Sequence, residues 1–191
     1  MKVFAVILSV FALPALGKCD VSDSTNGPSH YVNLFYGQDQ LVLGSEDQRY
    51  GGGIGYAYGR PEPRFQRGRI TGQLIYEIYG DHTQSSGVDG KHSEPTVAVG
   101  SLAYARWRWP IDAAGNGVYA ELGWGFQLAN RSTVDLDSQL NSTPVTGFGG
   151  TFKVGKQELT LGLRYLHISN AGLRGHNFGQ NELLILAGVR Y

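Results

Sequence analysis

Eight segments of this chain alternate between apolar residues and polar or small residues, and this two-residue period constrains the fold more than any other feature. Successive side chains of a β-strand point to opposite faces, so each segment is predicted to be a strand with one apolar face. In segment 117–129, for example, Leu122 and Trp124 share one face while Glu121 and Gly123 share the other. No segment carries the 3.6-residue apolar spacing of a helix over a useful length. The predicted strands are 31–38, 49–59, 69–79, 96–109, 117–129, 145–154, 158–169 and 181–191.

Alternation alone permits two architectures. A soluble sandwich or barrel turns its apolar faces inward, whereas a membrane barrel turns them outward toward lipid. Here the opposite faces carry charges, which an eight-stranded barrel can pair inside a narrow lumen while glycines make room. The charges expected in the lumen are Arg69, Glu77, Arg106, Arg108, Glu121, Lys153 and Arg164.

The connections between the segments also favour a membrane barrel. Connections 110–116 and 155–157 are short, 60–68 is intermediate, and 80–95, 130–144 and 170–180 are long and polar. Short periplasmic turns and long outer loops are typical of bacterial outer-membrane barrels. Trp107 and Trp109 lie at a strand end and fit an interfacial aromatic girdle. The last segment closes on Tyr191, which resembles the assembly signal of such barrels. We therefore predict an all-β, eight-stranded antiparallel transmembrane barrel of the outer membrane.

The first 17 residues have the features of a cleaved secretory signal. Lys2 precedes an apolar stretch over 3–16, and the small residues Ala15 and Gly17 stand before a cleavage site at Lys18. The single barrel domain would then occupy residues 18–191. The chain has 16 basic and 16 acidic residues and no net charge, which disfavours nucleic acid as a partner.

A histidine and a serine continue the apolar face of the seventh segment. His167 and Ser169 have the same parity as Leu161 and Leu163, so they should face outward at the outer end of the strand. An even number of strands places both termini on the periplasmic side, so the following loop, 170–180, faces the exterior. Polar groups facing lipid are tolerable near this interface. A serine becomes a nucleophile when a neighbouring histidine takes its proton, although His-x-Ser spacing alone is a weak signal.

The longer string RYLHISNAGLRGHNFGQN, residues 164–181, resembles the PagL-type lipid A 3-O-deacylases, outer-membrane esterases of the acyloxyacyl hydrolase group. The family signature of His-x-Ser-Asn-Ala-Gly followed by Asn-x-Gly is matched by His167, Ser169, Asn170, Ala171, Gly172, Asn177 and Gly179. The resemblance implies a Ser–His esterase that removes the 3-O-linked acyl chain of lipid A in lipopolysaccharide, among outer-membrane lipids and without a metal or cofactor. It implies Ser169 as nucleophile and His167 as general base. Asn177, with Asn170 and Gly172, would support the oxyanion.

The chain departs from this family at the third catalytic position. The best-known members place an acid twelve residues after the serine, where this chain has Asn181, and Glu182 comes one residue later. Asn181 shares the outward parity of Leu183, while Glu182 should point into the lumen unless a bulge swings it outward. Asparagine can orient a histidine by accepting its N–H. We predict that Asn181 orients His167, with Glu182 as the alternative acid.

Other readings remain open. One is a non-enzymatic outer-membrane barrel for adhesion or envelope integrity with a degenerate motif, and another is a soluble secreted barrel that binds an apolar ligand. A metal site is conceivable around loop 83–91, but flexible polar loop residues are the favoured interpretation. Its candidate ligands are His82, His92, Asp81, Asp89 and Glu94. The acyl-chain preference and the oligomeric state, a homodimer included, are not given by the sequence.

Overall fold

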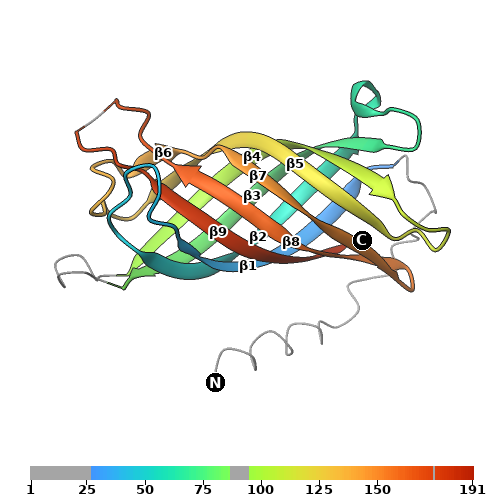
Figure 1. The fold of residues 1–191 in the computed structure, drawn as a ribbon, viewed down its shortest axis with the longest axis horizontal. Coiled ribbons are helices and arrows are strands. Elements are labelled where there is room, and N and C mark those ends of the chain that lie inside the picture. Colours follow the sequence, from blue (N-terminus) through green and yellow to red (C-terminus); the bar gives the residue numbers. More distant parts are fainter. Residues whose placement is uncertain (1–26, 87–94, 174) are drawn as a thin grey trace, which may run out of the picture.

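Eight long antiparallel strands close into a barrel (Figure 1). The computed structural model describes residues 27–86, 95–173 and 175–191, so the predicted signal 1–17 lies outside the described residues. Neighbouring strands pair in the order β4-β3-β2-β1-β9-β8-β7-β5, and β4 pairs with β5 to complete the ring. The barrel strands are β1 (Ser29–Asp39), β2 (Arg49–Pro61), β3 (Thr71–Ser85), β4 (Thr96–Pro110), β5 (Gly117–Ala129), β7 (Val145–Val154), β8 (Gln157–Ile168) and β9 (Gln180–Arg190). The predicted fold class is confirmed.

Two short elements stand outside the barrel strands. β6 (Leu140–Ser142) pairs with the end of β5, inside the predicted loop 130–144. The 3-10 helix η2 (Pro63–Phe65) follows β2 and begins on Glu62, whose side chain accepts a hydrogen bond from the Arg64 backbone N–H. Within the described residues, no helix is long and apolar enough to cross a membrane.

The strand ends differ from the predicted ones where the apolar pattern fades. β3 continues to Ser85 rather than ending at residue 79, because its polar end still pairs with the first residues of β2. β8 ends at Ile168, and Ser169 forms a separate bridge with Ser142 instead of extending the strand. Pairing in these places depends on a partner strand, not on local hydrophobicity.

The outward face of the barrel is an exposed apolar belt. It contains Ile54, Tyr56, Ile78, Val99, Leu122, Trp124, Phe126, Phe148, Leu161, Leu163, Leu183 and Ile185. Soluble monomers rarely expose apolar surface on this scale. A barrel with polar residues inside and apolar residues outside matches the outer-membrane architecture and contradicts the soluble alternative.

Paired charges fill the middle of the lumen. The Arg164 guanidinium lies 3.1 Å from a Glu77 carboxylate oxygen and 2.8 Å from a Glu121 carboxylate oxygen, and Arg106 approaches the other Glu121 oxygen at 2.8 Å. Gly55 makes room for this network, because a Cβ there would overlap the Glu77 carboxylate. Buried charges are tolerated when they are paired in this way.

Two of the charges expected in the lumen lie elsewhere. Arg69 precedes β3 in the turn where Arg67 bridges Ile70, and its side chain is exposed. Lys153 is exposed near the end of β7. Both residues have lumen parity but sit at strand ends, where the barrel no longer encloses them, so the prediction was wrong for them.

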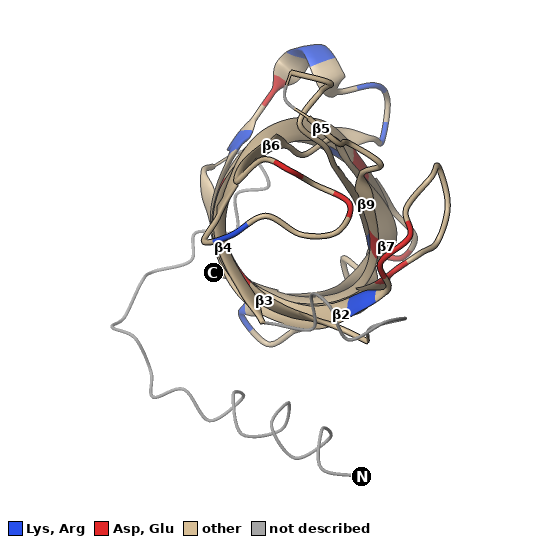
Figure 2. Ribbon diagram, turned by 90° about the vertical axis from the view of Figure 1, so that its left-hand side faces the viewer, with Lys and Arg blue, Asp and Glu red and all other residues tan. Residues whose placement is uncertain are grey.

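The two ends of the barrel carry different connections. Loops 40–48, 130–139 and 169–179 share one end, and Figure 2 looks into the barrel from that side, where chain segments lie across part of the opening. The short turn between β7 and β8 lies at the opposite end, together with the joined termini of the barrel. There His30 N–H donates to the Tyr191 carbonyl at 3.2 Å, and Tyr191 N–H donates back at 3.0 Å.

Candidate active site

The antiparallel register of β8 and β9 places His167 directly opposite Asn181 on the outward face. His167 Nδ1 lies 2.8 Å from Asn181 Oδ1, a hydrogen-bonding distance. The next outward pair along the strands is Tyr165 opposite Leu183. The regular ladder thus joins two predicted site residues that are 14 positions apart in the chain.

Asn181 is fully buried although it belongs to the outward face, with none of its surface exposed. Its Oδ1 also accepts a hydrogen bond from the Tyr165 hydroxyl at 2.6 Å. Its Nδ2 donates to the backbone carbonyl of Val42 at 2.8 Å. Gln40 N–H donates to the Asn181 carbonyl, again at 2.8 Å, so the β1–β2 loop covers this side chain.

Ser169 lies one step beyond His167, at the end of the strand. Its backbone exchanges two hydrogen bonds with Ser142, at 2.7 and 3.0 Å, and the two hydroxyl oxygens are 3.5 Å apart. Both side chains are half-buried. In the described part of the chain, no hydrogen bond joins Ser169 to the His167 imidazole, and the closest hydroxyl partner of Ser169 is Ser142.

The loop after Ser169 is organised by its asparagines. Asn170 N–H donates to Asn177 Oδ1 at 2.9 Å, and Gly172 N–H donates to Asn170 Oδ1 at 2.9 Å. Ala171 and Gly172 adopt positive φ values of 55° and 71°, which turn the chain sharply. The N–H groups of Asn170 and Gly172 are therefore already engaged, while Asn177 keeps its amide NH₂ beside the loop.

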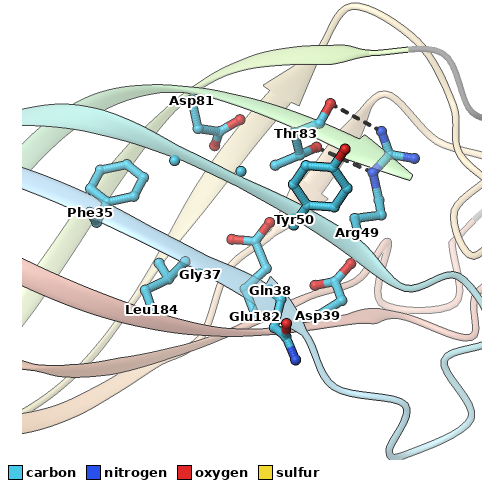
Figure 3. A pocket seen from close by; sticks show the side chains of 12 residues that line it. Phe35, Gly37, Gln38, Asp39, Arg49, Tyr50, Asp81, Thr83, Glu182 and Leu184 are labelled. Atoms are coloured by element: carbon cyan, nitrogen blue, oxygen red, sulfur yellow. Dashed lines mark hydrogen bonds between the residues drawn. The ribbon is translucent and has the colours of Figure 1, made fainter. Parts of the chain in front are cut away.

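Glu182 points into the lumen, on the opposite side of the barrel wall from His167. Figure 3 shows it beside Asp39, with Asp81 and Arg49 lining the same small cavity of about 10 Å³. The β8–β9 ladder is continuous from Ile168–Gln180 to Glu158–Arg190, so no bulge turns this carboxylate outward. The structure brings Asn181, and not Glu182, to His167.

No metal centre is formed by the candidate ligands that the structure describes. Within the described ranges, no group of three or more His, Cys, Asp or Glu side chains is arranged to hold an ion. His82 is exposed on β3 and Asp81 is buried on the lumen side. Asp89, His92 and Glu94 lie outside the described residues.

Sequence reasoning missed three contributors to this site. Tyr165 has the same parity as His167 and stands two residues before it, so its proximity could have been inferred. Val42 contributes a backbone carbonyl from 139 positions away, and no local pattern reveals it. Ser142 lies in β6, a strand too short to give a periodic signal.

Comparisons with known proteins concern the family and the fold of the chain. The model of the lipid A 3-O-deacylase (PagL) family matches residues 49–190, and no curated protein matches the chain. The crystal structure of the outer membrane enzyme PagL superposes with a TM-score of 0.64 at 20% identity, over 83% of this chain and 97% of that one. The crystal structure of Neisserial surface protein A superposes with a TM-score of 0.55 at 16% identity, over 86% of this chain and 96% of that one.

The structural neighbours establish the outer-membrane barrel fold, while the family model supplies the identity. That model spans more than half of the chain and includes every residue of the site except the β1–β2 loop. The chain belongs to the lipid A 3-O-deacylase (PagL) family of esterases.

Proposed function

We propose that this protein hydrolyses the 3-O-linked acyl ester of lipid A on the outward rim of the barrel, with Ser169, His167 and Asn181 as its catalytic group. The observation that carries the proposal is the 2.8 Å contact between His167 and Asn181 on the outward face, with His167 two residues before Ser169. A base held by a third group next to a serine is the arrangement that nucleophilic ester hydrolysis requires.

The first chemical step transfers the acyl chain to the enzyme. Ser169 Oγ turns from Ser142 toward His167 Nε2, gives up its proton there and forms a bond to the ester carbonyl carbon. The bond from that carbon to the 3-oxygen of the sugar then breaks, and the imidazolium returns the proton to the leaving oxygen. Nucleophile–base contacts are often longer in a site without substrate, so the lack of a Ser169–His167 hydrogen bond among the described residues is compatible with this step.

The second step frees the enzyme. Water loses a proton to His167 Nε2 and attacks the acyl carbon, the bond to Ser169 Oγ breaks, and the fatty acid leaves while Ser169 recovers its proton. In both steps negative charge develops on the former carbonyl oxygen. The NH₂ group of Asn177 is the donor we assign to this charge, because the neighbouring N–H groups of Asn170 and Gly172 are engaged within the loop.

Apolar side chains surround the polar site on the outward face. Below the His167–Asn181 pair, the ladder continues with Tyr165 and Leu183, then Leu163 and Ile185. This track runs from the rim into the apolar belt, so an acyl chain with its ester at Ser169 would lie along it. Exposed apolar residues of the covering β1–β2 loop, Leu43 above all at 75% exposure, extend the same surface.

Lipid A mass spectrometry tests the function directly. Lipid A from a host that expresses the protein in its outer membrane should lose one 3-hydroxyacyl unit compared with lipid A from the vector control. Purified protein in detergent should release the same fatty acid from isolated lipid A. Unchanged lipid A in both experiments, with correctly folded protein, would leave a non-enzymatic envelope role as the better explanation.

Gly179 holds the space that the His167 ring occupies. A Cβ at residue 179 would lie 2.8 Å from His167 Cε1, and the backbone there has a φ of 80°, which disfavours other residues. Gly179→Ala should therefore push the imidazole away from Asn181 and lower kcat/KM by roughly 10–100-fold, since small misplacements of catalytic groups have effects of this size.

The rate of fatty-acid release from lipid A measures this effect. Gly155→Ala is the matched control, because Gly155 also has a positive φ of 61° but has open space around it in the β7–β8 turn. The control should keep the parental rate. Equal rates for Gly179→Ala and Gly155→Ala would show that the ring position does not matter.

A further inference from the structure

Asn181 is an amide at a position where an acid would orient the histidine without ambiguity. A carboxylate presents two equivalent acceptor oxygens, whereas an amide presents one acceptor oxygen and one NH₂ donor. If the NH₂ group faced His167 Nδ1, the ring would have to accept there and carry its proton on Nε2. The imidazole would then have no lone pair for the Ser169 proton. The amide serves catalysis in only one of its two orientations.

The Val42 carbonyl selects that orientation. A backbone carbonyl can only accept hydrogen bonds, and the Val42 oxygen lies 2.8 Å from Nδ2 of Asn181. The reversed amide would bring two oxygens together at this distance, and solvent could not separate them because the Asn181 side chain is fully buried. Because Nδ2 must face Val42, Oδ1 must face the opposite side, where His167 Nδ1 lies at 2.8 Å.

The Tyr165 hydroxyl anchors the same amide from the other side. It lies 2.6 Å from Oδ1 of Asn181 and donates its proton to that oxygen. After reversal of the amide the hydroxyl would accept a hydrogen bond from the NH₂ group instead, so Tyr165 anchors the side chain while Val42, which can only accept, selects its orientation. Tyr165 and Val42 therefore hold the two ends of one side chain.

We propose that Tyr165 and the Val42 backbone carbonyl are positioning groups that fix the Asn181 amide and thereby place the neutral His167 proton on Nδ1. Nε2 is then the free base that faces the reacting serine. The inference rests on the proposed function for its kinetic consequence, but the protonation pattern is a property of the resting protein. It explains how this chain can use asparagine where the family's best-known members use an acid.

The first test is the tautomer of His167. Nitrogen-15 NMR of the folded protein in detergent micelles distinguishes Nδ1–H from Nε2–H imidazole, and His167→Gln identifies the signals. The parent should show the Nδ1–H form at a pH where the ring is neutral. Tyr165→Phe combined with Gly44→Ala should shift population to Nε2–H. A parent ring protonated on Nε2 would overturn the proposal, whether or not the protein deacylates lipid A.

Gly44→Ala serves to move the Val42 carbonyl without touching the site. Gly44 has a φ of 96° in the turn where Ser45 N–H donates to the Val42 carbonyl, so a side chain there strains the loop. Gly155→Ala, with a φ of 61° at the opposite end of the barrel, is the control for strain alone. Tyr76→Phe, at an exposed tyrosine of β3, is the control for loss of a hydroxyl.

The second test is a double-mutant comparison of kinetics. Tyr165→Phe should lower kcat on lipid A by about fivefold in the parent, as expected for one lost hydrogen bond. In an Asn181→Asp background either oxygen can accept from His167 and there is no amide orientation to fix, so Tyr165→Phe should lower kcat less than in the parent. This effect is measured relative to Asn181→Asp alone, because that variant itself places an oxygen against the Val42 carbonyl. KM should change little in either case. Equal loss in both backgrounds, with the control variants at parental rates, would assign Tyr165 a merely structural role and overturn the proposal.

The two tests separate failure of this inference from failure of the proposed function. If the parent protein leaves lipid A intact but carries the His167 proton on Nδ1, the proposed function is wrong and the positioning role stands. If the parent protein deacylates lipid A but carries the His167 proton on Nε2, the function stands and the positioning role is wrong. Heat-modified mobility on a gel verifies that each variant is a closed barrel before either measurement.

Discussion

Ser169→Ala should reduce deacylation of lipid A by about 10³-fold or more. Lipid A from cells that express this variant should then give the same mass spectrum as lipid A from the vector control. The variant keeps His167 and Asn181 but has no hydroxyl to form the acyl intermediate, and loss of a nucleophile in triad hydrolases has effects of this size. The fold should persist, because the backbone hydrogen bonds between Ser169 and Ser142 do not involve the side chain.

Ser142→Ala is the matched control for this experiment. Its hydroxyl lies 3.5 Å from that of Ser169 in the same backbone bridge, so it shares the location but not the proposed chemistry. We expect at most a fewfold change in rate. If Ser169→Ala still removed the acyl chain, or if Ser142→Ala were the inactive variant, Ser169 would not be the nucleophile.

Arg164→Met should lower the free energy of unfolding by about 3–5 kcal/mol, the effect of removing one partner from a buried ion pair. Arg164 contacts Glu77 and Glu121, and all three side chains are almost completely buried in the lumen. Glu121 would retain Arg106, but Glu77 would keep only neutral partners, including the Tyr104 hydroxyl at 2.8 Å. An unpaired carboxylate would then remain in the barrel centre.

Urea-dependent unfolding in lipid vesicles, followed by tryptophan fluorescence, measures this change. Arg69→Met removes the same charge at an exposed position and should alter stability by less than about 0.5 kcal/mol. Combining Arg164→Met with Glu77→Gln should recover part of the loss, because the stranded charge is removed. A stability of Arg164→Met within 1 kcal/mol of the parent would show that water, and not the ion pair, supports Glu77.

The barrel could be predicted from the sequence because its two faces are chemically distinct over whole strands. Residues such as Leu122 and Glu121 alternate without interruption, and a register shift would expose charge to lipid. The errors lie at strand ends. β3 extends six residues past its predicted end because polar pairing leaves no hydropathy signal. Arg69 and Lys153 have lumen parity but lie where the barrel no longer encloses them, which parity alone does not reveal.

The site was predictable only in part. The two-residue period of a strand is enough to place His167 and Asn181 on one face and Glu182 on the other, so the sequence predicted both placements. The loop bonds that engage the N–H groups of Asn170 and Gly172 depend on φ values that local sequence does not determine. The Val42 contact depends on the closed ring, in which β1 lies beside β9.

That adjacency couples assembly of the site to closure of the barrel. β1 and β9 become neighbours only when the barrel closes. The β1–β2 loop reaches Asn181 across this pair of strands. A nascent polypeptide in transit to its membrane already contains the serine and the histidine but lacks the contacts that orient them. Under the proposed mechanism, the contacts that orient the histidine are therefore complete only once the barrel has closed.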